Sequence, residues 1–194
     1  MADRNPTSQW NPAYPPDLSP SDYEVEVVAW LRQLGESLDR FDVQHLKHLQ
    51  GSAGDYEFDG VAEFTILGGA KILIIVECKR YSSPVERDHL ITLWGKKDDV
   101  SAHKAMMFAT CGFQSGALDY ARQKGIATIT FVRGEFLYET RSRITTPDPP
   151  TWLNLPSYAG ILMQKEAGNI LCSTIDRDDV GPLQAWIRNN EHPA

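Results

Sequence analysis

The order of expected strands and helices predicts an α/β protein, a three-layer α/β/α sandwich with a central mixed β-sheet. The runs 72–79 and 126–132 are apolar and rich in β-branched residues, which is typical of strands covered on both faces. Helical patterns separate the strands expected over 72–79, 104–110 and 126–132, and this alternation implies parallel crossover connections. A tight turn at 68–71 joins a strand over 58–67 to the next one, which adds an antiparallel pair.

The first 35 residues combine a proline-rich arm with a helix. Residues 1–20 contain five prolines and little apolar periodicity, so we expect a flexible, extended arm. A helix is expected from Asp22 to about Gly35, because its apolar residues recur at helical spacing. Either Ser19 or Ser21 can cap the start of this helix.

The remaining elements follow from the same signals. Pro84 favours the start of a helix over 85–99, and Gly125 closes a helix over 115–124 in the C′ position. Further elements are expected as strands over 42–49, 158–164 and 169–173 and a helix over 182–189. A break at the prolines between 147 and 150 divides the chain after the arm into a domain over 21–146 and a C-terminal hairpin and helix extension over 147–194.

The composition is that of one globular domain and excludes several classes of protein. The chain has 194 residues, 42% hydrophobic and 23% charged, with a net charge of −7, which excludes a polybasic coat protein. Three cysteines without a CxxC pair exclude a disulfide scaffold and a zinc knuckle. The longest aliphatic run, 72–76, is too short to cross a bilayer, and the first residues lack an apolar signal segment. We therefore expect a cytoplasmic protein with no membrane partner.

The charge is distributed unevenly along the chain. Residues 1–70 carry 4 basic and 12 acidic side chains, whereas residues 71–150 carry 12 basic and 9 acidic ones. The middle of the chain is therefore the part suited to a polyanion, although ordinary solvated faces explain the same small excess.

A charged triplet ends the most apolar strand of the chain. Strand alternation places Glu77 and Lys79 on one face and Cys78 on the other. Ionised groups at the end of a buried strand are costly unless they are paired or bind a metal. Asp59 and Glu77 lie nine and eight residues from the two turn glycines, so antiparallel pairing sets them side by side to within about one residue.

Two carboxylates beside a lysine suit metal-dependent hydrolysis of phosphodiester bonds. Oxygen ligands supplemented by water suit Mg²⁺, with Mn²⁺ as a substitute, and the backbone carbonyl of Cys78 is a further candidate ligand. A lysine at such a site orients or deprotonates the attacking water, or stabilises the transition state. A surface strand end with a Glu–Lys pair is the alternative interpretation of the triplet.

Five segments of the chain, taken in order, carry a family resemblance. They are the helix start Tyr23-Glu24, the run Gly54-Asp55-Tyr56-Glu57-Phe58-Asp59-Gly60, the strand end Val76-Glu77-Cys78-Lys79-Arg80, the helix over 85–93, and Thr110-Cys111-Gly112-Phe113 with Tyr120-Ala121 and Gly125-Ile126 after it. Together they resemble the Mrr-type restriction endonucleases of the PD-(D/E)xK nuclease superfamily, over about residues 22–132. The resemblance implies a restriction-endonuclease-like fold and a DNA endonuclease acting in defence against foreign DNA.

The resemblance also implies roles for individual residues. It makes Asp59 and Glu77 metal ligands, Lys79 the catalytic lysine, and Glu24 a helix carboxylate that reaches the same site. Helical spacing agrees for Glu24, which lies in line with the apolar positions of its helix. A first-turn acid that complements the helix dipole is the alternative for Glu24.

Four residues are weaker candidates for contacts with DNA. Gln114 begins the helix over 115–124, where phosphate binding is favourable, although a helix cap is the simpler explanation. Arg80, Arg87 and Lys96 are candidates for phosphate contacts, with a solvated helix face as the alternative.

The histidines offer no metal site by their spacing. His45 and His48 are three residues apart on an expected strand, so their side chains point to opposite faces. We expect both to be surface residues.

The function expected from the residues and the resemblance together is that of a Mg²⁺-dependent DNA endonuclease. A net charge of −7 predicts weak non-specific DNA affinity, so we expect a homodimer or a partner protein to supply specificity. A DNA repair nuclease or junction resolvase on the same core is one alternative, and it would prefer branched or nicked DNA. A non-catalytic DNA-binding or assembly module is the alternative of another class, and it would not bind Mg²⁺.

Overall fold

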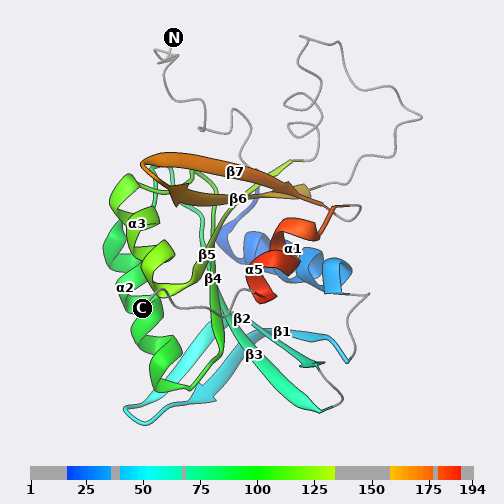
Figure 1. Ribbon diagram of the computed structural model, residues 1–194. Coiled ribbons are helices and arrows are strands. Elements are labelled where there is room, and N and C mark those ends of the chain that lie inside the picture. The colour runs from blue at the N-terminus through cyan, green and yellow to red at the C-terminus, as the bar shows by residue number, and fades with distance from the viewer. Residues whose placement is uncertain (1–16, 36–39, 67–68, 134–157, 177–178, 189–194) are drawn as a thin grey trace, which may run out of the picture.

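A seven-stranded mixed β-sheet runs through the centre of the protein in the computed structural model, which describes residues 17–35, 40–66, 69–133, 158–176 and 179–188 (Figure 1). The strands lie in the sheet in their order along the chain: the first three are antiparallel, the third to fifth parallel, and the last three antiparallel. The strands are β1 (Asp42–Gln50), β2 (Asp55–Ile66), β3 (Ala70–Lys79), β4 (Lys104–Ala109), β5 (Ile126–Arg133), β6 (Tyr158–Glu166) and β7 (Asn169–Ile175).

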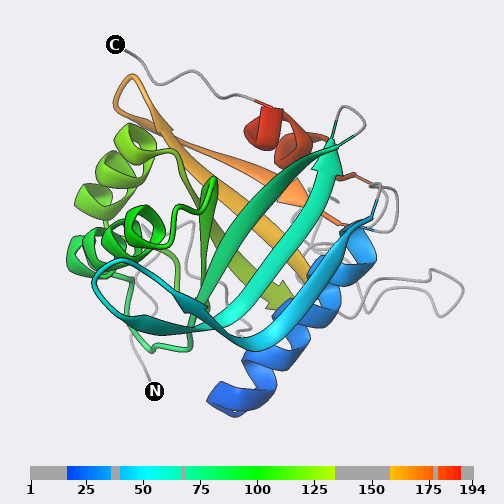
Figure 2. The same cartoon turned by 90° about the horizontal axis from the view of Figure 1, so that it is seen from below.

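Helices cover both faces of this sheet. α1 (Pro20–Leu34) and α5 (Gly181–Arg188) lie on one face, and α2 (Arg87–Asp99) and α3 (Ser115–Lys124) lie on the other (Figures 1 and 2). Two separate apolar cores follow from this arrangement, one on each face. The predicted three-layer α/β/α sandwich with a mixed sheet is therefore confirmed.

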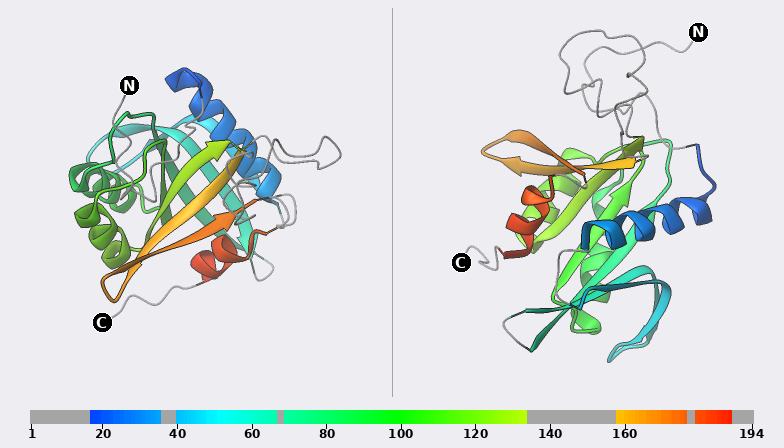
Figure 3. Two further views of the ribbon diagram at one scale, coloured as in Figure 1. Left: turned by 90° about the horizontal axis from the view of Figure 1, so that it is seen from above. Right: turned by 90° about the vertical axis from the view of Figure 1, so that its right-hand side faces the viewer.

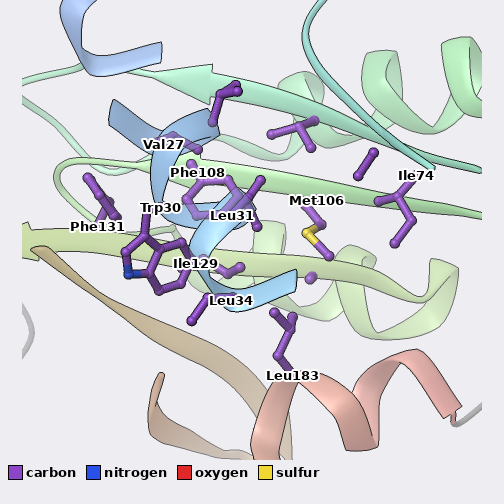
Figure 4. Packing of buried hydrophobic residues seen from close by; sticks show 14 of the residues in the cluster. Val27, Trp30, Leu31, Leu34, Ile74, Met106, Phe108, Ile129, Phe131 and Leu183 are labelled. Carbon is purple, nitrogen blue, oxygen red and sulfur yellow. The ribbon is translucent and has the colours of Figure 1, made fainter. Parts of the chain in front are cut away.

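The core under α1 is built on aromatic rings. Trp30 packs edge-on against Phe108 and Phe131, with ring centroids 5.9 and 5.5 Å apart, and its neighbours Val27, Leu31 and Leu34 point into the same core (Figure 4). A fully buried side chain of this size contributes about 1.5–3 kcal/mol by leaving water. This packing fixes α1 on the sheet, and with it any polar side chain that α1 carries.

The ends of the helices follow from capping residues. The Ser19 side chain accepts a hydrogen bond from the Asp22 amide, at 3.1 Å, and so caps α1. Gly125 ends α3 in the left-handed conformation, with φ of +65°, as expected for a C′ glycine. α2 begins at Arg87 rather than at 85, because Val85 forms a parallel bridge with Phe113 instead.

Two strand boundaries differ from expectation. β2 begins at Asp55 rather than at 58, because Gln50 pairs with Asp55 and the β1–β2 ladder continues to a short turn. Ala70 and Lys71, expected in a turn, already pair with β2 as the first residues of β3. Both differences lengthen the antiparallel part of the sheet.

The expected C-terminal hairpin forms β6 and β7, and it continues the central sheet because β6 pairs with β5. The hairpin and the β1–β2–β3 segment lie at opposite ends of the sheet (Figure 3). The arm expected over 1–20 lies outside the described residues up to 16, as do residues 134–157. Among the described helices, none is long and apolar enough to cross a membrane.

Candidate active site

The pairing of β2 with β3 brings Asp59 beside Glu77. The β2–β3 ladder ends where Gly60 pairs with Val76, and Asp59 and Glu77 are the next residues on the two strands. The expected register is therefore confirmed. Gly60 has a further role here, because a Cβ at this position would lie 3.2 Å from Val28 of α1. The glycine lets α1 approach β2 next to Asp59.

Glu77 is held between two lysines at the end of β3. Its side chain is only 9% exposed. Lys79 lies 3.0 Å from Glu77 Oε2, and Lys96 of α2 lies 2.6 Å from Glu77 Oε1. Cys78 faces the other way and is buried in the core under α1. Two charge-assisted contacts of this kind offset part of the cost of burying a carboxylate.

Asp59 is hydrogen-bonded to the backbone of β3, and its pKa is raised. Its Oδ2 accepts a hydrogen bond from the Cys78 amide, at 2.6 Å. Burial raises the pKa of Asp59 to about 6, and the negative charges of Glu77 and Glu24 add to the effect, while the Cys78 amide and Lys79 oppose it. A nearby cation would therefore stabilise the negative charge of the half-buried Asp59.

Glu24 reaches the same place from the opposite face of the sheet. Its charge acts on both Asp59 and Cys78. Its Oε2 lies 3.3 Å from His45 Nε2 of β1. Glu24 thus projects inward from α1 instead of standing at the exposed helix start.

Lys79 remains charged in this environment. Burial, the largest influence, lowers the pKa of Lys79, but the charge of Glu77 and the hydrogen bond to it, together with the charge of Asp59, raise it above its usual value. An ammonium group suits the binding of a developing negative charge, and it cannot accept a proton from water.

The donors of this cluster fit a hard divalent cation. Carboxylate and carbonyl oxygens are the ligands that Mg²⁺ takes, usually with several waters. The half-buried Asp59 and the buried Glu77 are two such carboxylates on neighbouring strands. Among the described residues, no three side chains of His, Cys, Asp or Glu stand in a metal-binding arrangement, so backbone oxygen and water would have to complete the coordination.

The other candidate residues lie apart from this cluster. Arg80 is exposed just after β3, and Arg87 lies over the Tyr120 ring, 5.3 Å from its centroid. Gln114 occupies the N-cap position of α3 without capping it, and its Nε2 lies 3.4 Å from Glu86. No contact within the described part of the chain joins these side chains to the carboxylates.

Sequence reasoning missed two members of the cluster. Lys96 was expected to face DNA phosphates, but the structure places it on Glu77. His45 was expected at the surface, but it is 25% exposed and contacts Glu24. The available signal for Lys96 was its position three residues after Leu93, the spacing of one helix face.

The fold and the cluster define an α/β protein with carboxylates and lysines gathered at the end of a central strand. A family model described as a restriction endonuclease, Mrr_cat, matches residues 16–140. This match covers well over half of the chain, and the chain therefore belongs to the Mrr-type restriction endonuclease family. The matched segment runs from α1 through β5 and includes every residue of the cluster.

Two solved structures are similar to part of the chain. The first is a crystal structure of a protein of unknown function, AF1548, at 22% identity and a TM-score of 0.47, covering 57% of each chain. The second is the DNA modification-dependent restriction endonuclease AspBHI, at 17% identity and a TM-score of 0.42, covering 62% of this chain and 30% of AspBHI. The chain thus spans 57% and 30% of the lengths of these two proteins. No curated protein matches the chain.

Proposed function

We propose that this nuclease domain is a Mg²⁺-dependent DNA endonuclease of Mrr type that hydrolyses phosphodiester bonds in defence against foreign DNA. The observation that carries the proposal is that Asp59, Glu77 and Lys79 meet at the end of β3, where the charge of Glu24 from α1 also acts on Asp59. Charged groups so gathered and partly buried lower the stability of a fold, and such costly arrangements cluster at functional sites. The family assignment supplies the substrate class.

Asp59, Glu77 and the backbone carbonyl of Cys78 would hold Mg²⁺, and Mn²⁺ would substitute for it. The cation, when bound, neutralises negative charge on the scissile phosphate and makes a water molecule a better nucleophile. The hydrogen bond from the Cys78 amide fixes Asp59 Oδ2, which leaves Oδ1 for the cation.

Lys79 acts as a charged partner of the reacting phosphate. Its raised pKa keeps the ammonium protonated at neutral pH, so the residue binds negative charge as it develops on the phosphate oxygens. Glu24 accepts a proton or a hydrogen bond from a water molecule on the α1 side of the cluster, and His45 orients Glu24.

DNA contacts and assembly complete the proposal. Arg80, Arg87 and Gln114 bind the DNA backbone, with weak non-specific affinity because the net charge is −7. One site per chain cuts one strand, so cleavage of both strands involves a homodimer or a partner protein. A cytoplasmic location agrees with three cysteines that are all free thiols.

The test is cleavage of supercoiled plasmid, methylated and unmethylated, in Mg²⁺ or Mn²⁺. The protein nicks or linearises the plasmid, and Lys79→Ala lowers the rate by about 10²–10³-fold. The matched control is Lys71→Ala, which removes an exposed lysine from the other end of the same strand and leaves the rate unchanged.

Two outcomes would count against the proposal. Absence of cleavage on both plasmids in both metals would favour a non-catalytic module. Faster cleavage of a branched or nicked duplex than of the plain duplex would favour a repair nuclease or junction resolvase.

A further inference from the structure

Lys96 of α2 is built into the cluster by two contacts. Its ammonium lies 2.6 Å from Glu77 Oε1 and 5.5 Å from the centroid of the Phe58 ring. Phe58 is fully buried and directly precedes Asp59 in β2. Lys96 therefore touches one of the two proposed metal-binding carboxylates and the residue next to the other.

The end of α2 is fixed to the sheet as well. Asp99, three residues after Lys96, accepts hydrogen bonds from the Ala53 amide at 3.0–3.1 Å and from the Ser52 hydroxyl. These bonds tie the last turn of α2 to the loop between β1 and β2. The position of Lys96 is thus set by the anchored end of α2 as well as by the contacts of its own side chain.

The two lysines on Glu77 differ in what else they face. The charges of Lys79 and Asp59 act on each other, whereas Lys96 contacts the other oxygen of Glu77, Oε1, and lies against Phe58. Glu77 Oε2 contacts Lys79, whose charge also acts on Asp59, so a cation held by Asp59 and Glu77 would use Oε2. The cation would then replace the Lys79 contact at Oε2, while Lys96 would keep its contact with Oε1.

We propose that Lys96 is a positioning residue, which holds Glu77 Oε1 so that Oε2 points toward Asp59 and the divalent cation. The inference rests on the proposed function and assigns that site a further residue. Hydrogen-bond partners of metal-binding carboxylates set the direction of the ligand oxygen, and their loss typically weakens metal binding by about 10–100-fold.

Electrostatic repulsion between Lys96 and the cation would have the opposite effect on metal affinity. A lysine that only repels the cation would weaken metal binding, so its removal would tighten it. Positioning and repulsion therefore predict opposite changes in metal affinity when Lys96 is replaced.

The experiment is Mn²⁺ titration of the DNA-free protein by calorimetry, with Lys96→Met, Lys96→Arg and Lys97→Met beside the wild type. Lys96→Met removes the donor and weakens Mn²⁺ binding by about 10-fold. Lys96→Arg keeps a charged donor and restores most of the affinity. Lys97→Met is the matched control, because it removes the neighbouring lysine of the same helix. Burial, and after it the charge of Lys97, lowers the pKa of Lys104, so Lys97 acts on Lys104.

A second readout separates positioning from loss of structure. In plasmid cleavage, Lys96→Met raises the Mg²⁺ concentration for half-maximal rate by about 10-fold, and saturating Mg²⁺ restores most of the maximal rate. Unchanged or tighter Mn²⁺ binding by Lys96→Met overturns the inference while the proposed function stands. Mn²⁺ binding by none of the variants, together with no cleavage by the wild type, overturns both.

Discussion

Two groups of carboxylates on the same strand have opposite surroundings. Asp55 and Glu57 of β2 are half exposed, at 53% and 54%, and both contact the exposed His48 of β1, at 3.0 and 2.9 Å. Asp59 lies two residues further along β2, half-buried beside Glu77. We call His48, Asp55 and Glu57 the hairpin cluster, and the site around Asp59 and Glu77 the buried cluster.

The difference shows that burial and neighbours, not residue type, separate a candidate site from an ordinary surface. In the hairpin cluster, hydrogen bonding to Asp55, the largest influence, raises the pKa of His48, as an ion pair in water does. In the buried cluster, desolvation raises the pKa of Asp59 to about 6. Water screens the first group of charges and leaves the second to interact strongly.

The largest expected effect is that of Glu77→Gln. The substitution removes the buried proposed metal ligand and leaves two ammonium groups facing a neutral amide. Plasmid cleavage falls by about 10³-fold or more, and urea denaturation of the metal-free protein shows a loss of about 1–3 kcal/mol. Glu57→Gln in the hairpin cluster is the control, and equal losses in the two variants would erase the distinction between the clusters.

The next effect concerns pH and Asp59. The unfolded chain releases the Asp59 proton near pH 3.8, whereas the fold holds it until about pH 6. The fold therefore binds more protons in this window, and its stability falls as pH rises from about 4 to 6. Asp59→Asn removes this loss, so in EDTA at pH 7 the variant is more stable than the wild type by about 1–2 kcal/mol, after allowance for solvent screening.

Urea denaturation across pH 4–7 measures this change in the free energy of unfolding. Asp55→Asn in the hairpin cluster is the matched control and leaves the loss between pH 4 and 6 in place. If the free energy of unfolding of Asp59→Asn falls between pH 4 and 6 as that of the wild type does, Asp59 is not the group that causes the fall.

A smaller effect is expected at the Glu24–His45 contact. This pair is partly buried, with side chains 21% and 25% exposed. A double-mutant cycle with Glu24→Gln and His45→Ala at pH 6 should give a coupling energy of about 0.5–1 kcal/mol in stability. Zero coupling would mean that His45 does not orient Glu24.

The smallest effect is expected in the hairpin cluster. The raised pKa of His48 means that its ion pairs add stability below pH 6.5, and that this contribution is lost as pH rises through the pKa of the folded protein. NMR titration should find the His48 pKa above 6.5 in the wild type and lower in Asp55→Asn, with plasmid cleavage unchanged. A drop in cleavage by Asp55→Asn would tie the hairpin cluster to the active site.

Strand pairing and alternation made part of the buried cluster predictable from the sequence. Asp59 and Glu77 could be paired because antiparallel strands keep equal offsets from their turn, and the alternation along β3 separates Cys78 from its neighbours. Ser19, one of the two serines expected as a cap, begins α1 at Pro20, two residues before the expected Asp22, and Gly125 ends α3 as expected. These features need only neighbouring residues.

The parts that could not be predicted depend on long-range packing. Lys96 reaches Glu77 because α2 lies across Phe58 and is tied to the β1–β2 loop by Asp99. His45 reaches Glu24 because α1 packs over β1 and β2, with Gly60 permitting the close approach. Helix spacing indicates which face of α2 carries Lys96, but spacing along one element identifies the partner of neither Lys96 nor His45.

The most direct test of the account compares Asp59→Asn with Asp55→Asn in Mg²⁺-dependent cleavage of supercoiled plasmid. The two variants make the same chemical change four residues apart on β2. We expect that Asp59→Asn abolishes cleavage, while Asp55→Asn cleaves as the wild type does. Equal cleavage by the two variants would contradict the claim that the buried cluster is the site of a metal-dependent nuclease.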